Sequence, residues 1–324
     1  MNPLISVILP NYNHANFLEK RLESIFNQTY SNFEVILLDD CSTDNSKEIL
    51  LKYSKNEYVS HCVFNEINSG NTFIQWKKGI ALAKGEFIWI AESDDFCDPN
   101  FLESVSKPLL LNNQITLSYC QSNRVDVHDE IIGNWKTYTD DLDTEQFTQN
   151  FVMDGNLFIE KYLINKNVIP NASAVLFRKE NLEISDQLIN TPALKYCGDW
   201  VIYFQAIIKQ KISFIAESIN NFRYHHNSVI ALVSKSEKKA SLIDIDLQMR
   251  EVIANYLQLN TLANKEQIIK QNQKISKLLK YDKALLLFNN KKKWKAILIL
   301  LGIFDLFIKK YPFRKRFKNI INFF

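Results

Sequence analysis

The sequence is poor in cysteine and in long apolar runs. Its five cysteines are an odd number, and no two are spaced as C-x-x-C. That argues against a disulfide framework or a zinc site and favours a reducing compartment. The longest apolar run, Ala296 to Ile308, has about 13 residues and contains Asp305, whereas a membrane-spanning helix needs about 20. No basic segment precedes the first apolar run, and Pro10 comes too early for a signal peptide. We therefore expect a cytoplasmic protein, or one bound peripherally to the inner face of the cell membrane.

Charge is distributed unevenly along the chain. The net charge of +3 combines ten Lys and Arg and one acid in residues 291–324 with 29 basic and 35 acidic residues in the first 290. A general nucleic-acid-binding protein carries its positive charge across a folded face, so no nucleic-acid partner is expected. An apolar content of 46% without low-complexity tracts indicates a folded chain.

Short apolar runs alternate with amphipathic segments in the first 120 residues. The runs predict buried strands at 4–10, 33–40, 59–64 and 86–95. Helices are predicted after them at 14–30, 42–55, 71–85 and 98–111. This alternation is typical of βαβ units, and it predicts an α/β fold with a doubly wound, mostly parallel, Rossmann-like sheet.

The second half of the chain is less regular. Strands are predicted at 115–120, 172–178 and 212–219, and a helix at 198–211. We divide the chain into a domain at 1–232, a C-terminal helical extension at 233–290 and a basic amphipathic tail at 291–324. The first domain comprises a nucleotide-binding half, 1–120, and an acceptor half, 121–232.

Polar clusters follow three of the predicted strands. They are Pro10-Asn11-Tyr12-Asn13, Asp39-Asp40 and Asp94-Asp95. Ligands of doubly wound sheets bind beyond the carboxyl ends of the strands, so we expect these clusters to share one site. The adjacent charges of Asp94 and Asp95 repel each other. They either form a solvated turn or hold a cation.

Several motifs, in order, resemble those of the family 2 glycosyltransferases with the GT-A fold. They are "SVILPNYN", "VILLDDCSTDNS", "NSGN", "KKGIALAKGEFIWIAESDD", "GDW" and "FRYHHNS". The resemblance covers roughly residues 3–230. It implies inverting transfer of a single hexosyl or N-acetylhexosaminyl group from a nucleotide diphosphate sugar. The acceptor would be a hydroxyl of a glycan or a lipid-linked glycan in bacterial cell-surface polysaccharide synthesis.

Two other functions remain open alongside this one. Sugar nucleotidyltransferases also have a doubly wound nucleotide domain, but they carry a G-x-G-T-R-L loop that "PNYNHANF" does not resemble. The second is a catalytically inactive nucleotide-sugar-binding scaffold.

The resemblance assigns residues to the donor. Asp40 would accept the N3–H of uracil, which favours a UDP-sugar, and capping of a helix is its alternative role. Pro10, Tyr12 and Asn13 match a loop in which the Tyr packs against the base. Asn68 and Gly70 match another part of the nucleotide pocket.

The resemblance also implies a divalent cation, Mn²⁺ or Mg²⁺. These ions prefer oxygen ligands. Asp95 would bind the ion, and Asp94 would face the ribose. His225 would bind the ion or a phosphate, accompanied by Arg223, and a structural role is its alternative.

One position departs from the family pattern. Trp76-Lys77 stands where relatives carry an Arg-Asn pair, and that Arg usually lies near the diphosphate. Lys77, or its neighbour Lys78, is the candidate replacement. Lys is a point charge without the planar fork of Arg. A solvated helix face is the alternative for both lysines.

Asp199, in "CGDWVIYF", matches the family's catalytic base at the start of a helix beside the acceptor. Its alternative role is to cap that helix. The tail at 291–324 alternates Lys and Arg clusters with aromatic and aliphatic residues. That pattern predicts an anionic membrane surface as a partner, with helix packing or an oligomer contact as the alternative.

Overall fold

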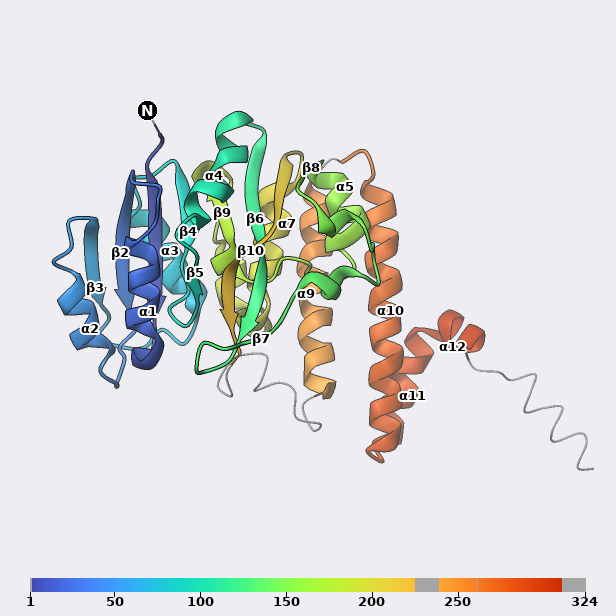
Figure 1. Cartoon of the computed structure of the whole chain (residues 1–324). Helices are drawn as coiled ribbons and strands as arrows, with labels where there is room; N and C mark the ends of the chain where they lie inside the picture. Colours follow the sequence, from blue (N-terminus) through green and yellow to red (C-terminus); the bar gives the residue numbers. More distant parts are fainter. Residues whose placement is uncertain (1, 225–238, 261, 311–324) are drawn as a thin grey trace, which may run out of the picture. The chain divides into compact units, whose positions relative to one another are not determined.

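The protein is described by a computed structural model that covers residues 2–224, 239–260 and 262–310 (Figure 1). His225 lies outside the described residues. The chain separates into two compact units, residues 1–231 and 232–324.

The first unit is built on one large sheet. Its strands run in the order β3-β2-β1-β4-β9-β6-β10-β5, with β7 on β6 and β8 on β10. The strands are β1 (Ile5–Asn11), β2 (Phe33–Asp39), β3 (Val59–Phe64), β4 (Phe87–Ile90), β5 (Phe96–Cys97), β6 (Ile115–Val125), β7 (Ile131–Asn134), β8 (Phe151–Asp154), β9 (Val175–Arg178) and β10 (Lys211–Arg223). The described helices of this unit are α1 (Ala15–Phe26), α2 (Ser46–Tyr53), α3 (Thr72–Leu82), α4 (Phe101–Leu111), α5 (Gly155–Phe158), α6 (Asp186–Asn190) and α7 (Gly198–Ile207).

The α/β fold with a mostly parallel central sheet agrees with the sequence prediction. β1, β2, β3 and β4 pair in parallel, as do β6 and β10. β9 is the exception in the middle of the sheet, because it pairs antiparallel with both β4 and β6.

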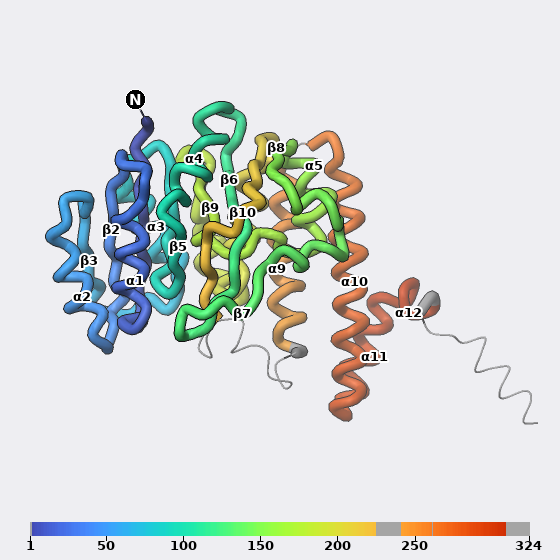
Figure 2. The backbone as a smooth tube through the Cα atoms, in the orientation of Figure 1, coloured from blue at the N-terminus to red at the C-terminus, as the bar shows by residue number. Residues whose placement is uncertain are grey.

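Helices cover both faces of the sheet. Apolar side chains of β1 alternate between the faces: Val7 belongs to the core shared with α1, α2 and α4, whereas Ile8 meets α3. α3 can lie so close because its contact residue is Gly79, where a Cβ would stand 2.3 Å from Ile8 Cγ2. α1 and α3 accordingly lie on opposite sides of the blue strands (Figure 2).

Two of the boundaries that differ from the predicted ones lie beside the acidic residues after β4. The strand predicted at 86–95 ends at Ile90, and residues 92–95 form a turn before the short β5. The following helix begins at Phe101 with Asn100 as its N-cap residue, not at Asp98. The acidic residues after β4 are therefore loop residues, which frees their side chains from the sheet.

The second unit is helical. Its described helices are α9 (Lys239–Leu259), α10 (Lys265–Asn289), α11 (Lys293–Gly302) and α12 (Phe304–Lys310). Ala284 and Leu287 of α10 pack with Ala296, Leu300 and Ile303 in a small core. Among the described residues no helix has the length and apolar content needed to cross a membrane.

Candidate active site

The ends of β1 and β2 are joined by hydrogen bonds between their loops. The Asp40 amide donates to the Asn11 carbonyl at 2.9 Å. Asn13 has a left-handed backbone (φ 55°), and its Oδ1 accepts from the Thr43 amide at 2.7 Å, while its own amide donates to Ser42 Oγ. This fixes the loop that contains Tyr12, directly after β1, in which Pro10 lies. The Tyr12 side chain is 45% exposed, as required for a ring that packs against a ligand.

The buried carboxylate of Asp40 is surrounded by donors. It accepts from Asn65 Nδ2 at 2.6 Å, from Gln75 Nε2 at 2.8 Å, and from the amide and hydroxyl of Ser69 at 3.0 and 2.7 Å. A carboxylate offers about four lone-pair positions, so these bonds occupy its capacity. An incoming N–H donor would have to replace one of the protein donors.

Asn68 and Gly70 belong to the same cluster. Asn68 Nδ2 donates to the Asp40 carbonyl at 2.9 Å, and Asn68 Oδ1 accepts from the Gly70 amide at 2.7 Å. Gly70 has φ +67°, a left-handed conformation that glycine adopts without strain. The structure therefore brings together Asp40, Asn68, Gly70 and the loop after β1.

A second acidic group lies in the loop after β4. Asp95 is 2% exposed; its Oδ1 accepts from the Arg223 amide at 2.9 Å and its Oδ2 from Asn171 Nδ2 at 2.6 Å. Glu92 accepts from Trp76 Nε1 at 2.9 Å. Asp94 lies between them, and its negative charge acts on both neighbours.

We call residues 92–95 the acidic loop. Ionisation of its buried carboxyl groups is unfavourable. Burial, together with the charge of Asp94, raises the pKa of Asp95 to about 7. The same two causes raise the pKa of Glu92 to about 8. The buried guanidinium of Arg21, on α1, offsets part of this effect. Carboxylates that share a small volume favour a bound cation.

Arg223 stabilises the acidic loop through hydrogen bonds. Its side chain is 1% exposed, and its Nε donates to the Asp94 carbonyl at 2.7 Å. Its other nitrogens bind the Asp126 carbonyl and Asp129 Oδ1, at 2.6 and 2.5 Å. The structure thus places Arg223 beside the predicted metal residues, with its guanidinium bound to protein oxygens.

Asp199 lies in the first turn of α7. Burial raises its pKa to about 6, and hydrogen bonds from the Trp200 amide and Asn167 oppose the rise. The bond from Asn167 Nδ2 is long, at 3.3 Å. The preceding Gly198 allows close packing, because a Cβ there would stand 2.7 Å from Phe73 Cε2.

The three acidic positions are linked through α3. Gln75 of this helix binds Asp40, Trp76 binds Glu92 in the acidic loop, and Phe73 packs against Gly198 beside Asp199. A second link is the segment before β9, in which Asn167 binds Asp199 and Asn171 binds Asp95. Residues that are far apart in the sequence therefore lie around one helix.

No set of three His, Cys, Asp or Glu side chains with metal-binding geometry occurs among the residues that the structure describes. His225, which is predicted to bind the ion together with Asp95, lies outside them. Asp95 is the predicted ligand that the structure describes, with Asp94 beside it.

The family model "Glycosyl transferase family 2" matches residues 6–166. The match covers roughly half of the chain and includes β1, α3 and the acidic loop. The chain belongs to glycosyl transferase family 2.

Relatives of this family 2 glycosyltransferase include two bacterial proteins. The glycosyltransferase GlyG of Streptococcus pneumoniae is 28% identical over 241 residues, which cover 71% of this chain and 74% of GlyG. The putative teichuronic acid biosynthesis glycosyltransferase TuaG of Bacillus subtilis is 38% identical over 93 residues, 29% of this chain and 36% of TuaG.

Solved structures agree on the GT-A fold of this glycosyltransferase. S. aureus TarS 1-349, in complex with UDP-GlcNAc, aligns with a TM-score of 0.59 at 15% identity, over 90% of this chain and 88% of TarS. The mannosyltransferase PcManGT of Pyrobaculum calidifontis, in complex with GDP-Man and Mn²⁺, aligns with a TM-score of 0.54 at 15% identity, over 97% of this chain and 83% of PcManGT.

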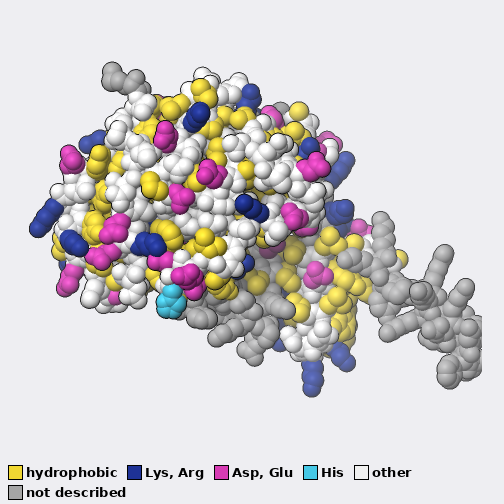
Figure 3. Space-filling model, in the orientation of Figure 1, with side chains coloured by type: hydrophobic (Ala, Val, Ile, Leu, Met, Phe, Trp, Pro, Cys, Tyr) yellow, Lys and Arg dark blue, Asp and Glu magenta, His cyan; other side chains and the backbone are white. Residues whose placement is uncertain are grey.

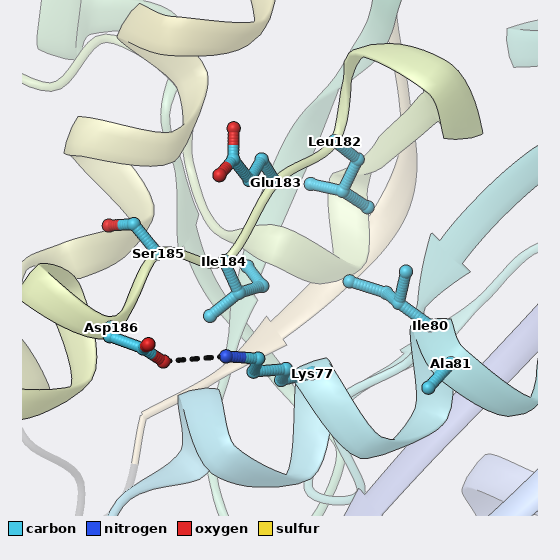
Figure 4. Close-up of a pocket in the computed structure, with 8 residues that line it drawn as sticks. All are labelled: Lys77, Ile80, Ala81, Leu182, Glu183, Ile184, Ser185 and Asp186. Carbon is cyan, nitrogen blue, oxygen red and sulfur yellow. Dashed lines mark hydrogen bonds and ion pairs between the residues drawn. The ribbon is translucent and has the colours of Figure 1, made fainter.

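The lysines of α3 point in different directions. Lys77 Nζ pairs with Asp186 at 2.7 Å, on the rim of a shallow hollow of about 390 Å³ between α3 and residues 182–186 (Figure 4). None of Asp40, Asp94, Asp95 and Asp199 lines this hollow. Lys78 Nζ instead donates to Asn65 Oδ1 at 2.6 Å, and Asn65 in turn binds Asp40. Lys78 is therefore connected to the donor-side cluster, and Lys77 is not.

Sequence reasoning missed several residues of this candidate site, among them Glu92, Asn167, Asn171 and Gln75. Glu92 stands two residues before the acidic pair in "AESDD", and its position after a buried strand was a usable signal. The two asparagines come from the irregular segment before β9, where the sequence shows no periodicity that would place them.

Proposed function

We propose that this enzyme transfers one hexosyl or N-acetylhexosaminyl group from a UDP-sugar, with inversion, to a hydroxyl of a glycan or lipid-linked glycan in cell-surface polysaccharide synthesis. The observation that carries the proposal is the grouping of Asp40, the acidic loop and Asp199 around α3. Inverting transfer needs residues that bind the nucleotide sugar, a group that stabilises the departing diphosphate, and a base beside the acceptor hydroxyl.

The cluster after β1, β2 and β3 supports a nucleotide at this edge of the sheet. Tyr12 offers an exposed ring, and Asp40 offers a carboxylate that would accept an imide N–H when Ser69 gives way. TarS was crystallised with UDP-GlcNAc and PcManGT with GDP-Man. The N3–H of uracil is a donor that Asp40 would accept, although thymine offers the same group.

The acidic loop fits a divalent cation. Its carboxylates provide the oxygen ligands that Mg²⁺ and Mn²⁺ prefer, and burial beside one another raises the pKa of Asp95 and Glu92. Asp95, with Asp94 beside it, would hold the ion. When bound, such an ion stabilises the negative charge of a departing diphosphate.

Asp199 is the proposed base. A base works best when its pKa lies near the operating pH, and burial brings the pKa of Asp199 to about 6. Its carboxylate would accept the proton of the acceptor hydroxyl as the hydroxyl oxygen attacks the anomeric carbon. Asn167 orients the carboxylate through its hydrogen bond.

An activity screen tests the proposal. Purified full-length protein is incubated with UDP-, GDP- and dTDP-sugars, a glycan acceptor, and either Mn²⁺ or a chelator, and the released nucleotide and the product's anomeric configuration are measured. We expect release with a UDP-sugar, loss with the chelator and an inverted product. Absence of turnover with every donor would favour the inactive scaffold, and a retained configuration would overturn the role of Asp199.

A further inference from the structure

An apolar strip runs along α11 and α12. We define the strip as Trp294, Ile297, Leu298, Leu301, Phe304 and Ile308. Trp294 is 81% exposed, Leu298 69% and Leu301 63%. The opposite side of α11 is used for folding, since Ala296 and Leu300 are buried against α10. The strip is therefore not required by the core of the second unit.

Lysines surround the strip. At about 100° per residue, its members in α11 fall within an arc of roughly 100°, and Lys293 and Lys295 lie on either side of that arc. Residues 291–310 contain six lysines and one acid, Asp305, which pairs with Lys277 of α10 at 2.6 Å. Hydrophobic side chains cover this part of the second unit, with Lys and Arg at its lower tip (Figure 3).

We propose that this strip binds the surface of an anionic lipid bilayer. An exposed apolar face with Trp, flanked by lysines, matches the two components of an interface: acyl chains for the strip and anionic headgroups for the ammonium groups. Docking on a second copy of the strip is disfavoured, because it would bring like charges together.

This inference rests on the proposed function in one respect only. A lipid-linked acceptor lies in a membrane, so an enzyme held at the bilayer surface meets its acceptor there. Membrane binding itself is measured without any sugar transfer, so the two proposals succeed or fail separately.

Vesicle flotation of the full chain tests the strip. We expect binding to vesicles of phosphatidylcholine with phosphatidylglycerol, and a decrease of at least about tenfold in the partition coefficient for Leu298→Glu, because a charge replaces an inserted leucine. Leu259→Glu is the matched control. Leu259 is 87% exposed at the end of α9, outside the strip, and its variant should bind like the wild type.

A second arm tests the lysines. Lys293→Gln and Lys295→Gln should each weaken binding about fivefold on anionic vesicles, and vesicles of phosphatidylcholine alone should bind the wild type more weakly.

Three results would overturn the proposal: no binding by the wild type, equal binding by Leu298→Glu, or equal binding to the neutral vesicles.

Light scattering and thermal unfolding of the Leu298→Glu variant serve as controls. An unchanged unfolding temperature shows that Leu298→Glu is folded. A change of molecular mass in this variant, without a change in vesicle binding, identifies the strip as a subunit contact and rejects the bilayer. Turnover of a soluble acceptor by the variant, with vesicle binding lost, supports a binding role separate from catalysis.

Discussion

Asp40 and Asp199 are both carboxylates near α3, but their surroundings differ. Asp40 accepts hydrogen bonds from three side chains and one backbone amide, from Asn65, Ser69 and Gln75. Asp199 accepts from the Trp200 amide and, through a long bond, from Asn167, and burial raises its pKa to about 6. The comparison indicates that the donor side is organised in advance, whereas the acceptor side keeps a carboxylate able to exchange a proton.

The largest expected effect is that of Asp199→Asn. The amide cannot take a proton from the acceptor, so the transfer rate should fall about 10³-fold, within the range for a general base. The donor dissociation constant, measured by calorimetry, should change less than about threefold if chemistry and donor binding are separate.

Asp186→Asn is the matched control for this variant. It removes an exposed carboxylate that pairs with Lys77 outside the site. It should transfer at the wild-type rate. If Asp199→Asn lowered the transfer rate and the donor affinity by the same factor, Asp199 would not act on the acceptor side alone.

Removal of a divalent cation should come next in size. A chelator should lower transfer about 10²-fold, because the diphosphate would leave without a cation to stabilise it. Asp95→Asn should raise the concentration of Mn²⁺ needed for half-maximal rate by at least about tenfold. Full activity in the chelator would show that the acidic loop serves another purpose.

Replacing Asp40 and replacing Asp199 should change the free energy of unfolding in opposite directions. Asp40→Asn loses charge-assisted bonds inside the fold, so the free energy of unfolding should decrease by about 3 kcal/mol in urea. Asp199→Asn at pH 7.5 should increase that free energy, because a buried charge is removed. The gain should shrink as the pH falls below about 6 and vanish well below the ordinary pKa of 3.8, where Asp199 is protonated in both the folded and unfolded states. The exposed Glu66→Gln should stay within about 0.5 kcal/mol.

The pH dependence of transfer tests the same carboxylate. A base acts in its ionised form, and burial raises the pKa of Asp199 to about 6. At saturating donor and cation, kcat should therefore rise with pH up to about 6, about tenfold per unit below that value, and level off above it. A flat profile between pH 5 and 7 would exclude Asp199 as the group whose ionisation limits the rate.

The smallest effects should separate the two lysines of α3. Lys78→Ala should weaken donor binding about tenfold, because Lys78 reaches Asp40 through Asn65. Lys77→Ala should change it less than about twofold, since Lys77 only pairs with an exposed acid. The reverse order would restore the assignment of Lys77 to the diphosphate.

Local pattern accounts for the parts of the fold that the sequence predicts well. β1 and β2 are nearly continuous apolar runs, and parallel strands bring their carboxyl ends to one edge, so the grouping of Asp40 with the loop after β1 follows from topology. β9 could not be placed in this way. It inserts antiparallel between β4 and β6, and its position depends on packing between distant segments. The bond between Trp76 and Glu92 likewise depends on tertiary geometry, as does the contact between Gly198 and Phe73.

The position of α3 has a kinetic consequence. One rigid helix supports the carboxylate beside the nucleotide, the acidic loop, and the glycine before Asp199. A small translation of that helix would change the binding of the donor and of the acceptor at the same time. Changes at Phe73 or Gly79, neither of which needs to touch a sugar, should therefore raise the Michaelis constants of donor and acceptor together.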